Sequence, residues 1–93
     1  MLSSNPFSTG AQGSGVITIT EINHGRSSGD TVRLRGTETF DGITTAVLEL
    51  ASGYTITVVN ADTYTITVAG TATLGGISGG GTLASAGPVT PAA

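Results

Sequence analysis

The sequence predicts an all-β chain that forms a single small antiparallel barrel or sandwich of about five to seven strands, with an extended arm at each end. The pentapeptide Tyr-Thr-Ile-Thr-Val occurs twice, at 54–58 and 64–68, and alternates apolar residues with threonine at the period of a strand. The same alternation recurs at 16–22 and 31–35. A chain of 93 residues is long enough for one small domain.

The repeated pentapeptide predicts a β-hairpin. Asn60 and Asp62 lie in the spacer and supply turn chemistry. The two copies are offset by ten residues, an even number, so equivalent side chains point to the same sheet face. We therefore expect the threonines on one face and a core on the other, built from Tyr54, Ile56, Val58, Tyr64, Ile66 and Val68.

The first strand, 16–22, is followed by a loop rich in turn residues. Within this loop, glycine tolerates positive φ, and aspartate accepts hydrogen bonds from backbone N–H groups. The expected turn residues are His24, Gly25, Gly29 and Asp30.

The second strand, 31–35, adds Val32 and Leu34 to the predicted core and points Arg33 and Arg35 outward. The two arginines suggest a contact patch for an acidic partner. The alternative is a solvated face near Glu38 or Glu49.

Both ends of the chain differ in composition from the predicted β-barrel domain at 15–75. Residues 1–14 are rich in Ser, Gly, Asn and Pro, which predicts an extended arm that docks Pro6 and Phe7 into a neighbour; a disordered tail is the alternative. Residues 76–93 form a Gly/Ala/Pro-rich segment. Within it, 82–85 is compatible with one more strand.

Two internal stretches leave alternatives open. Residues 44–51 contain helix-favouring Ala, Leu and Glu but span only about two turns, and we interpret them as irregular. Five of the seven residues at 75–81 are glycine. This run is either a flexible tether or a backbone that passes close to another surface; it lacks the Gly-Lys-Ser/Thr ending of a phosphate-binding loop.

The composition of the chain argues against nucleic-acid binding, a membrane span, metal binding and catalysis. Three arginines and no lysine stand against six carboxylates, for a net charge of −3, so a nucleic-acid partner is not expected. No run reaches the roughly 18 apolar residues of a membrane span. There is no cysteine, His24 is the only histidine, and the aspartates lack the spacing of a calcium loop. We expect no enzymatic activity, no cofactor and no metal.

The order of turn and strand residues carries a resemblance to a known family. The segments Asn23-His24-Gly25, Ser28-Gly29-Asp30, Gly53-Tyr54-Thr55-Ile56 and Asn60-Ala61-Asp62, with Val32 and Gly36, resemble a β-rich module of tailed-bacteriophage virion proteins. That module is similar to a small β-barrel named for a domain of ubiquitin-activating enzymes, and the similarity concerns shape, not ubiquitin chemistry. The chain departs from the usual pattern at Arg26, at Ser52 and in the longer segment 44–51.

The resemblance implies a non-enzymatic virion subunit, made in the bacterial cytoplasm. It would dock on a larger capsid, neck or tail protein and contact copies of itself. The alternative is a receptor- or glycan-binding module of a phage fibre or spike.

Overall fold

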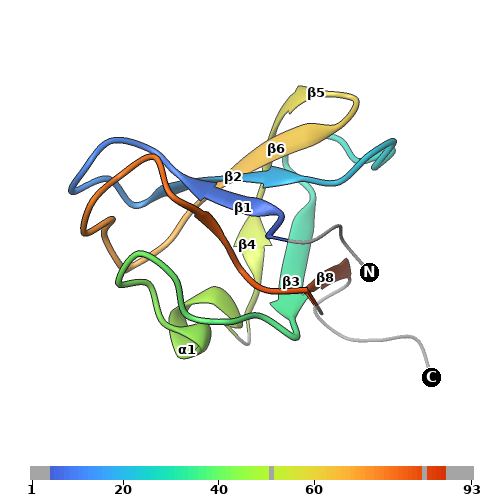
Figure 1. Cartoon of the computed structure of the whole chain (residues 1–93). Helices are drawn as coiled ribbons and strands as arrows, with labels where there is room; N and C mark the ends of the chain where they lie inside the picture. The colour runs from blue at the N-terminus through green and yellow to red at the C-terminus, as the bar shows by residue number, and fades with distance from the viewer. Residues whose placement is uncertain (1–4, 51, 83, 88–93) are drawn as a thin grey trace.

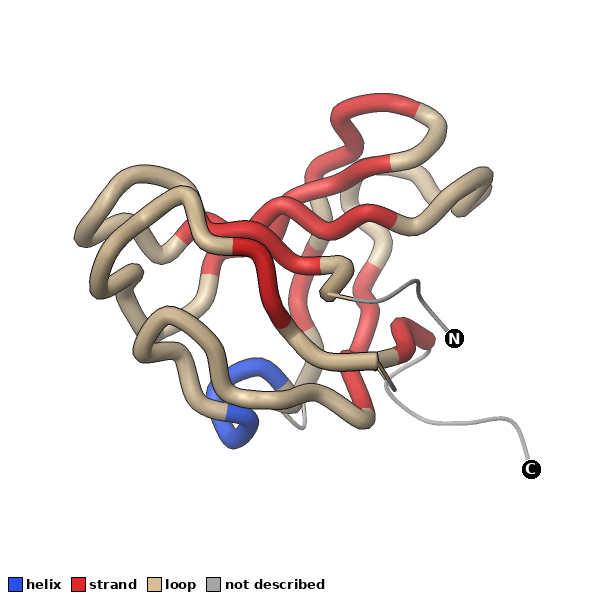
Figure 2. The backbone as a smooth tube through the Cα atoms, in the orientation of Figure 1, coloured by secondary structure: helices blue, strands red, loops and turns tan. Residues whose placement is uncertain are grey.

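The computed structural model describes residues 5–50, 52–82 and 84–87 and confirms the all-β prediction. These residues form two antiparallel sheets and one short helix (Figures 1 and 2). The strands of the larger sheet cross over β3 and β4 of the smaller one, and the core lies between the two sheets.

The larger sheet has five strands in the order β5-β6-β2-β1-β7. Each strand is antiparallel to its neighbours. Their bounds are Phe7–Thr9 (β1), Val16–Thr20 (β2), Thr57–Asn60 (β5), Thr63–Thr67 (β6) and Ser78–Gly79 (β7).

The smaller sheet has three strands in the order β4-β3-β8. Thr31–Arg35 (β3) lies in the middle, between Tyr54–Thr55 (β4) and Ser85–Gly87 (β8). Only Ile56 separates the end of β4 from the start of β5, so the chain passes from the smaller sheet into the larger one at this residue.

The predicted hairpin is correct only near its turn. Val58 pairs with Tyr64, and the register then shifts at a bulge before Asn60 pairs with Thr63. The first pentapeptide is split between the sheets, because Ile56 exchanges backbone hydrogen bonds with the loop before β3: its N–H donates to Asp30 O and its O accepts from Gly29 N–H. Two strand-like repeats therefore do not make one long hairpin.

Side chains from both sheets form one hydrophobic core. Of the eight residues that the sequence assigns to it, Val58 is half-buried and the other seven are buried. The core also contains seven side chains that the sequence did not assign to it: Phe7, Ile17, Ile19, Phe40, Ile43, Leu48 and Ala84.

The prediction of an N-terminal arm that docks Pro6 and Phe7 into a neighbour is wrong for the described residues. Both side chains are buried within this chain, and Phe7 is 0% exposed. Phe7 pairs with Ile19 on one side and Gly79 on the other, so β1 is an interior strand of the sheet. The physical reason is that burying a phenylalanine in a core with few aromatic residues is worth more than leaving it on a mobile arm.

The C-terminal segment also belongs to the domain as far as Gly87. A Cβ atom on Gly79 would lie 2.5 Å from Phe40 Cβ, and one on Gly80 would lie 2.2 Å from Phe7 Cδ2. The glycine run is therefore a backbone that passes close to another surface, and that surface is the core of its own domain. The additional strand is β8, shifted from the expected 82–85; residues 83 and 88–93 lie outside the described part.

The stretch interpreted as irregular contains a single turn of helix, Thr45–Leu48 (α1). Thr44 caps it by accepting a hydrogen bond from Val47 N–H. Leu48 is fully buried, and the Tyr54 hydroxyl donates to Val47 O. Tertiary packing of Leu48 thus stabilises a helix too short to be stable alone.

Substitution of Ile66 tests the facing of β6. Ile66 is 2% exposed, so Ile66→Ala should lower the free energy of unfolding by about 2–4 kcal/mol. Thr65 points to the opposite face, and Thr65→Ala should cost less than about 1 kcal/mol. Equal losses for the two variants in a urea titration would contradict this assignment.

Substitution of Phe7 tests whether β1 is part of the fold. Phe7→Ala should destabilise the domain by about 3–5 kcal/mol, because it empties a site lined by Gly80 and the core. Ser8→Ala, on the outer face of the same strand, is the control and should have little effect on the melting temperature. An unchanged melting temperature for Phe7→Ala would restore the arm hypothesis.

Candidate functional site

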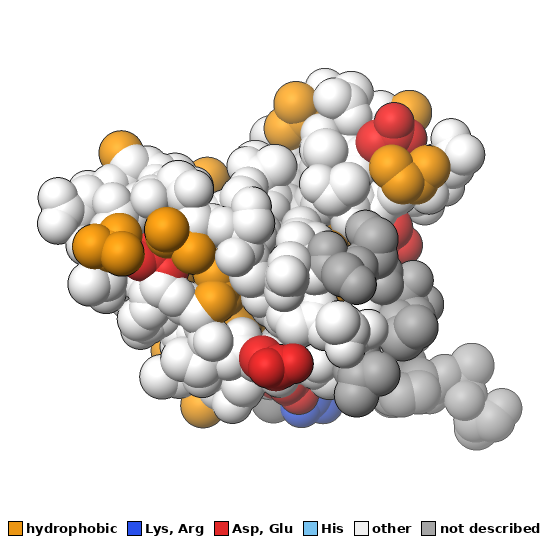
Figure 3. Space-filling view, viewed as in Figure 1, with side chains coloured by type: hydrophobic (Ala, Val, Ile, Leu, Met, Phe, Trp, Pro, Cys, Tyr) orange, Lys and Arg blue, Asp and Glu red, His pale blue; other side chains and the backbone are white. Residues whose placement is uncertain are grey.

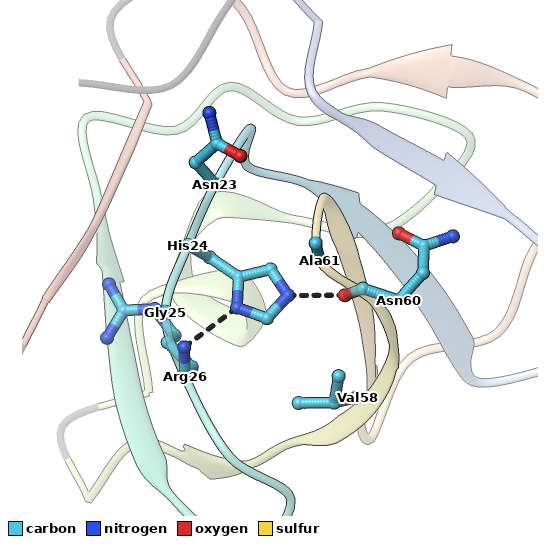
Figure 4. A pocket seen from close by; sticks show the side chains of 7 residues that line it. All are labelled: Asn23, His24, Gly25, Arg26, Val58, Asn60 and Ala61. Atoms are coloured by element: carbon cyan, nitrogen blue, oxygen red, sulfur yellow. Dashed lines mark hydrogen bonds between the residues drawn. The ribbon is translucent and has the colours of Figure 1, made fainter.

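A hollow among the described residues lies where the loop after β2 meets the outer edge of β5 (Figure 4). Its volume is about 330 Å³. It is lined by Asn23, His24, Gly25, Arg26, Val58, Asn60 and Ala61.

This loop covers the free edge of β5 with hydrogen bonds. Gly29 N–H donates to Ile56 O (3.0 Å), and Val58 N–H donates to the Ser28 hydroxyl (2.8 Å). His24 Nε2 lies 2.7 Å from Asn60 O. An exposed strand edge can pair with other chains, and this loop closes it for most of its length.

His24 has both ring nitrogens engaged within the chain. Nδ1 accepts a hydrogen bond from Arg26 N–H (2.9 Å), which assigns the proton to Nε2, the atom that donates to Asn60 O. The ring meets Tyr64 edge-on, with 5.2 Å between ring centroids. Figure 4 shows the imidazole held between the loop and Asn60. Both ring nitrogens of His24 thus hold the loop in place.

An ionic network lies beneath His24. Arg26 Nε donates to Glu21 Oε1 (2.9 Å), and the Tyr64 hydroxyl donates to the same oxygen (2.7 Å). Arg26 Nη2 also donates to Ala86 O (3.2 Å), so the network links the loop to β8 of the other sheet. Arg26 is therefore both an ion-pair partner and a link between the two sheets.

The network shifts three pKa values. Burial raises the pKa of Glu21, but the hydrogen bonds from Arg26 and Tyr64 outweigh it and leave the pKa below its ordinary value. The hydrogen bond to Glu21 raises the pKa of Arg26. Burial, together with the hydrogen bond to Glu21, raises the pKa of Tyr64. All three shifts favour an ionised Glu21–Arg26 pair beside a neutral tyrosine.

A second polar cluster centres on Asp41, which has a φ of 46°. Its carboxylate accepts hydrogen bonds from Thr9 Oγ1 (2.8 Å), Leu74 N–H (2.8 Å) and Gly75 N–H (3.0 Å). Desolvation raises the pKa of Asp41, but these hydrogen bonds outweigh it and the pKa is lowered. Asp41 thus joins β1 to the loop before β7, and its oxygens are used by the protein itself.

The remaining predicted turn residues have similar structural roles. Gly25 and Gly29 have positive φ angles, 64° and 97°. Asp30 accepts from Ser27 N–H (2.8 Å), and Asn60 Oδ1 accepts from Asp62 N–H (2.9 Å). Asp62 accepts from Asn23 N–H (3.0 Å), which ties the hairpin turn to the loop of the hollow.

The two arginines of the predicted contact patch, Arg33 and Arg35, do not join this site. They lie on β3 of the smaller sheet, pair with Gly87 and Ser85 of β8, and are half-buried. Within the described residues, Arg33 Nε is buried without a hydrogen-bond partner.

Sequence reasoning did not find the Glu21–Arg26–Tyr64 network. Its members come from the end of β2, a loop and β6, and no local spacing brings them together. In the part of the chain that the structure describes, no group of three His, Asp or Glu side chains could hold a metal ion.

Comparison with protein-family models, curated proteins and solved structures gives no match for this chain. Among the described residues, no helix has the length and apolar character needed to cross a membrane.

Glu21→Gln tests the ionic network. Because the pKa of Glu21 is lower in the folded state than its ordinary 4.5, the stabilisation is present above that value and is lost as the pH falls through the folded-state pKa. The variant should lose about 1–3 kcal/mol of unfolding free energy at neutral pH, and the difference from wild type should shrink below about pH 4. The exposed Glu38→Gln is the control and should change little. A difference independent of pH would contradict the ion pair.

Proposed function

We propose that this chain is a non-enzymatic structural subunit of a tailed-bacteriophage virion. One observation carries the proposal: the side chains capable of acid–base chemistry are bonded within the fold. His24 uses both ring nitrogens on backbone groups. Five of the six carboxylates accept hydrogen bonds from other residues of the chain; they are Glu21, Asp30, Asp41, Glu49 and Asp62.

The resemblance to the virion module supports the same proposal. Its most distinctive residues lie in the loop that covers β5. His24 and Gly29 bond to the backbone of the segment 56–60, and Asp30 stabilises the turn into β3. A motif whose residues serve the scaffold fits a family that functions by shape and assembly.

Exposed apolar side chains supply a contact surface in place of the predicted arms. Ile22 is 63% exposed, Val59 is 60% exposed and Leu74 is 70% exposed. Ile22 precedes the loop of the hollow and Val59 lies at the bulge of β5, so both belong to the end of the domain that carries the hairpin turn. Figure 3 shows that apolar side chains interrupt a surface that is otherwise mostly uncharged. The partners would be a larger capsid, neck or tail protein and further copies of the chain.

The alternative, a receptor- or glycan-binding module that stacks its tyrosines on a ligand, is less favoured. Tyr64 is fully buried and Tyr54 is 9% exposed. Both hydroxyls are also engaged, with Glu21 and Val47. Neither ring is available for stacking.

Replacement of the exposed apolar residues tests the docking surface. The double variant Ile22→Ser/Val59→Ser should fold with an unchanged melting temperature, because both side chains are mostly exposed. Its incorporation into particles, measured by mass spectrometry of gradient-purified virions, should fall at least about tenfold. Thr71→Ser/Thr73→Ser, at exposed loop positions, is the control. Absence of the wild-type chain from purified particles would overturn the virion role itself.

Dissociation conditions test the type of contact. Raising salt from about 0.05 to 0.5 M shortens the Debye length from roughly 14 to 4 Å and should release little of the subunit, since the exposed surface has few charges. Mild urea should release more, because it weakens apolar burial and peptide hydrogen bonding. Release by salt alone would indicate an electrostatic interface, with Arg33 and Arg35 as its first candidates.

A further inference from the structure

The loop at 21–30, which covers the edge of β5, is held by a histidine ring whose two nitrogens have different roles. His24 Nε2 donates to Asn60 O (2.7 Å), and Nδ1 accepts from Arg26 N–H (2.9 Å). The first bond joins the loop to β5, and the second fixes the backbone of the loop itself. Only a neutral imidazole with its proton on Nε2 can make both bonds.

Protonation of this ring breaks one of the two bonds. An imidazolium carries a proton on each nitrogen, so Nδ1 becomes a donor and faces the N–H of Arg26. Two donors directed at each other repel, whereas the bond from Nε2 to Asn60 O persists. The ring and the backbone of Arg26 must therefore move apart when His24 takes up a proton.

Among the described residues, the charged and titratable side chains near the ring lie in the loop and in the β5–β6 hairpin. They are Glu21, Arg26 and Asp30 in the loop, Asp62 in the hairpin turn and Tyr64 on β6. The strands β5 and β8 carry no titratable side chain. Glu21 attracts an imidazolium and Arg26 repels it, so their charges oppose each other and the lost bond at Nδ1 decides. Of these side-chain types, imidazole is the one that ordinarily changes its charge between about pH 5 and 8.

The surroundings of His24 allow the loop to move. The hollow of about 330 Å³ lies beside the ring, between the loop and β5 (Figure 4). Gly25 and Gly29 have positive φ angles, and a Cβ atom on either would meet no heavy atom within 4 Å beyond its chain neighbours. Two unhindered glycines thus bracket residues 26–28 and can absorb changes in backbone angle.

We propose that His24 is a pH-sensitive switch that controls access to the edge of β5. At about pH 7.5 the neutral ring holds the loop closed, and at about pH 5 the protonated ring releases the backbone at 26–28. Gly29 N–H then separates from Ile56 O, and the Ser28 hydroxyl separates from Val58 N–H. These backbone groups of 56–58 are the kind through which an edge strand pairs with an extended segment of another chain.

Hydrogen exchange of single amides tests the switch on the isolated chain, so the result is independent of the virion role. Exchange rates are measured by NMR at about pH 7.5 and 5 and compared with the intrinsic rates at each pH to give protection factors. The protection factors of Gly29 and Val58 should fall about three- to tenfold at the lower pH, as expected for the loss of one net hydrogen bond. Those of amides in the β2–β6 pair should not change, because the sheet stays folded.

His24→Asn separates the two roles of the ring. An asparagine side-chain oxygen accepts a hydrogen bond from the N–H two residues on, as in an Asx turn, and takes up no proton in this pH range. The variant loses the bond to Asn60 O, so its protection factors should be lower than those of wild type but equal at the two pH values. The matched control is Asp62→Asn, which keeps an oxygen acceptor for Asn23 N–H and should show the wild-type fall.

Four results would contradict the switch. The first is equal protection of Gly29 and Val58 in wild type at the two pH values. The second is a fall that persists in His24→Asn, and the third is its loss in Asp62→Asn, which would make Asp62 the titrating group. The fourth is an equal fall in the β2–β6 amides, which would show that the whole domain opens instead of the loop.

Discussion

The packing of Phe7 against the glycine backbone at 79–80 is the constraint on which the rest of the structure depends. Phe7 belongs to the first strand and the glycines to one of the last, so their contact brings together segments separated by more than 70 residues. Only a residue without a side chain leaves room for the ring at this distance. The N-terminal strand therefore becomes an interior strand, paired with β2 and β7.

Two small polar clusters then fix the segments that this packing brings together. Asp41 ties β1 to the loop before β7, and the Glu21–Arg26 pair ties the loop after β2 to β8. Each carboxylate sits at a junction between segments distant in sequence. With only nine charged residues other than histidine, the chain has few to place, and five of its six carboxylates accept hydrogen bonds within the fold.

Local patterns allowed the strands and most of the core to be predicted, because alternation reports which face of a strand is buried. Ile56 and Ile66 are buried as the period of two requires. Alternation does not report partners: the repeat suggested one hairpin, whereas Ile56 bonds to the loop before β3. Composition also misled at the ends of the chain. Glycine and serine near Phe7 resemble a tail, and only the three-dimensional contact with Gly80 shows why small residues are needed there.

Polar side chains meet different requirements on the two faces of the larger sheet. On the inner side Tyr64 is a buried tyrosine whose hydroxyl must be satisfied, and Glu21 satisfies it. On the outer side, neighbouring residues of the same strand, Thr63 and Thr65, meet no such requirement because water can reach them. Threonine suits this side because it combines the β-branched shape that strands favour with a hydroxyl group that bonds to water, whereas valine would expose an apolar surface. The alternation of buried apolar residues with solvated threonines along β2 and β6 therefore follows from a sheet that has one packed face and one face in water.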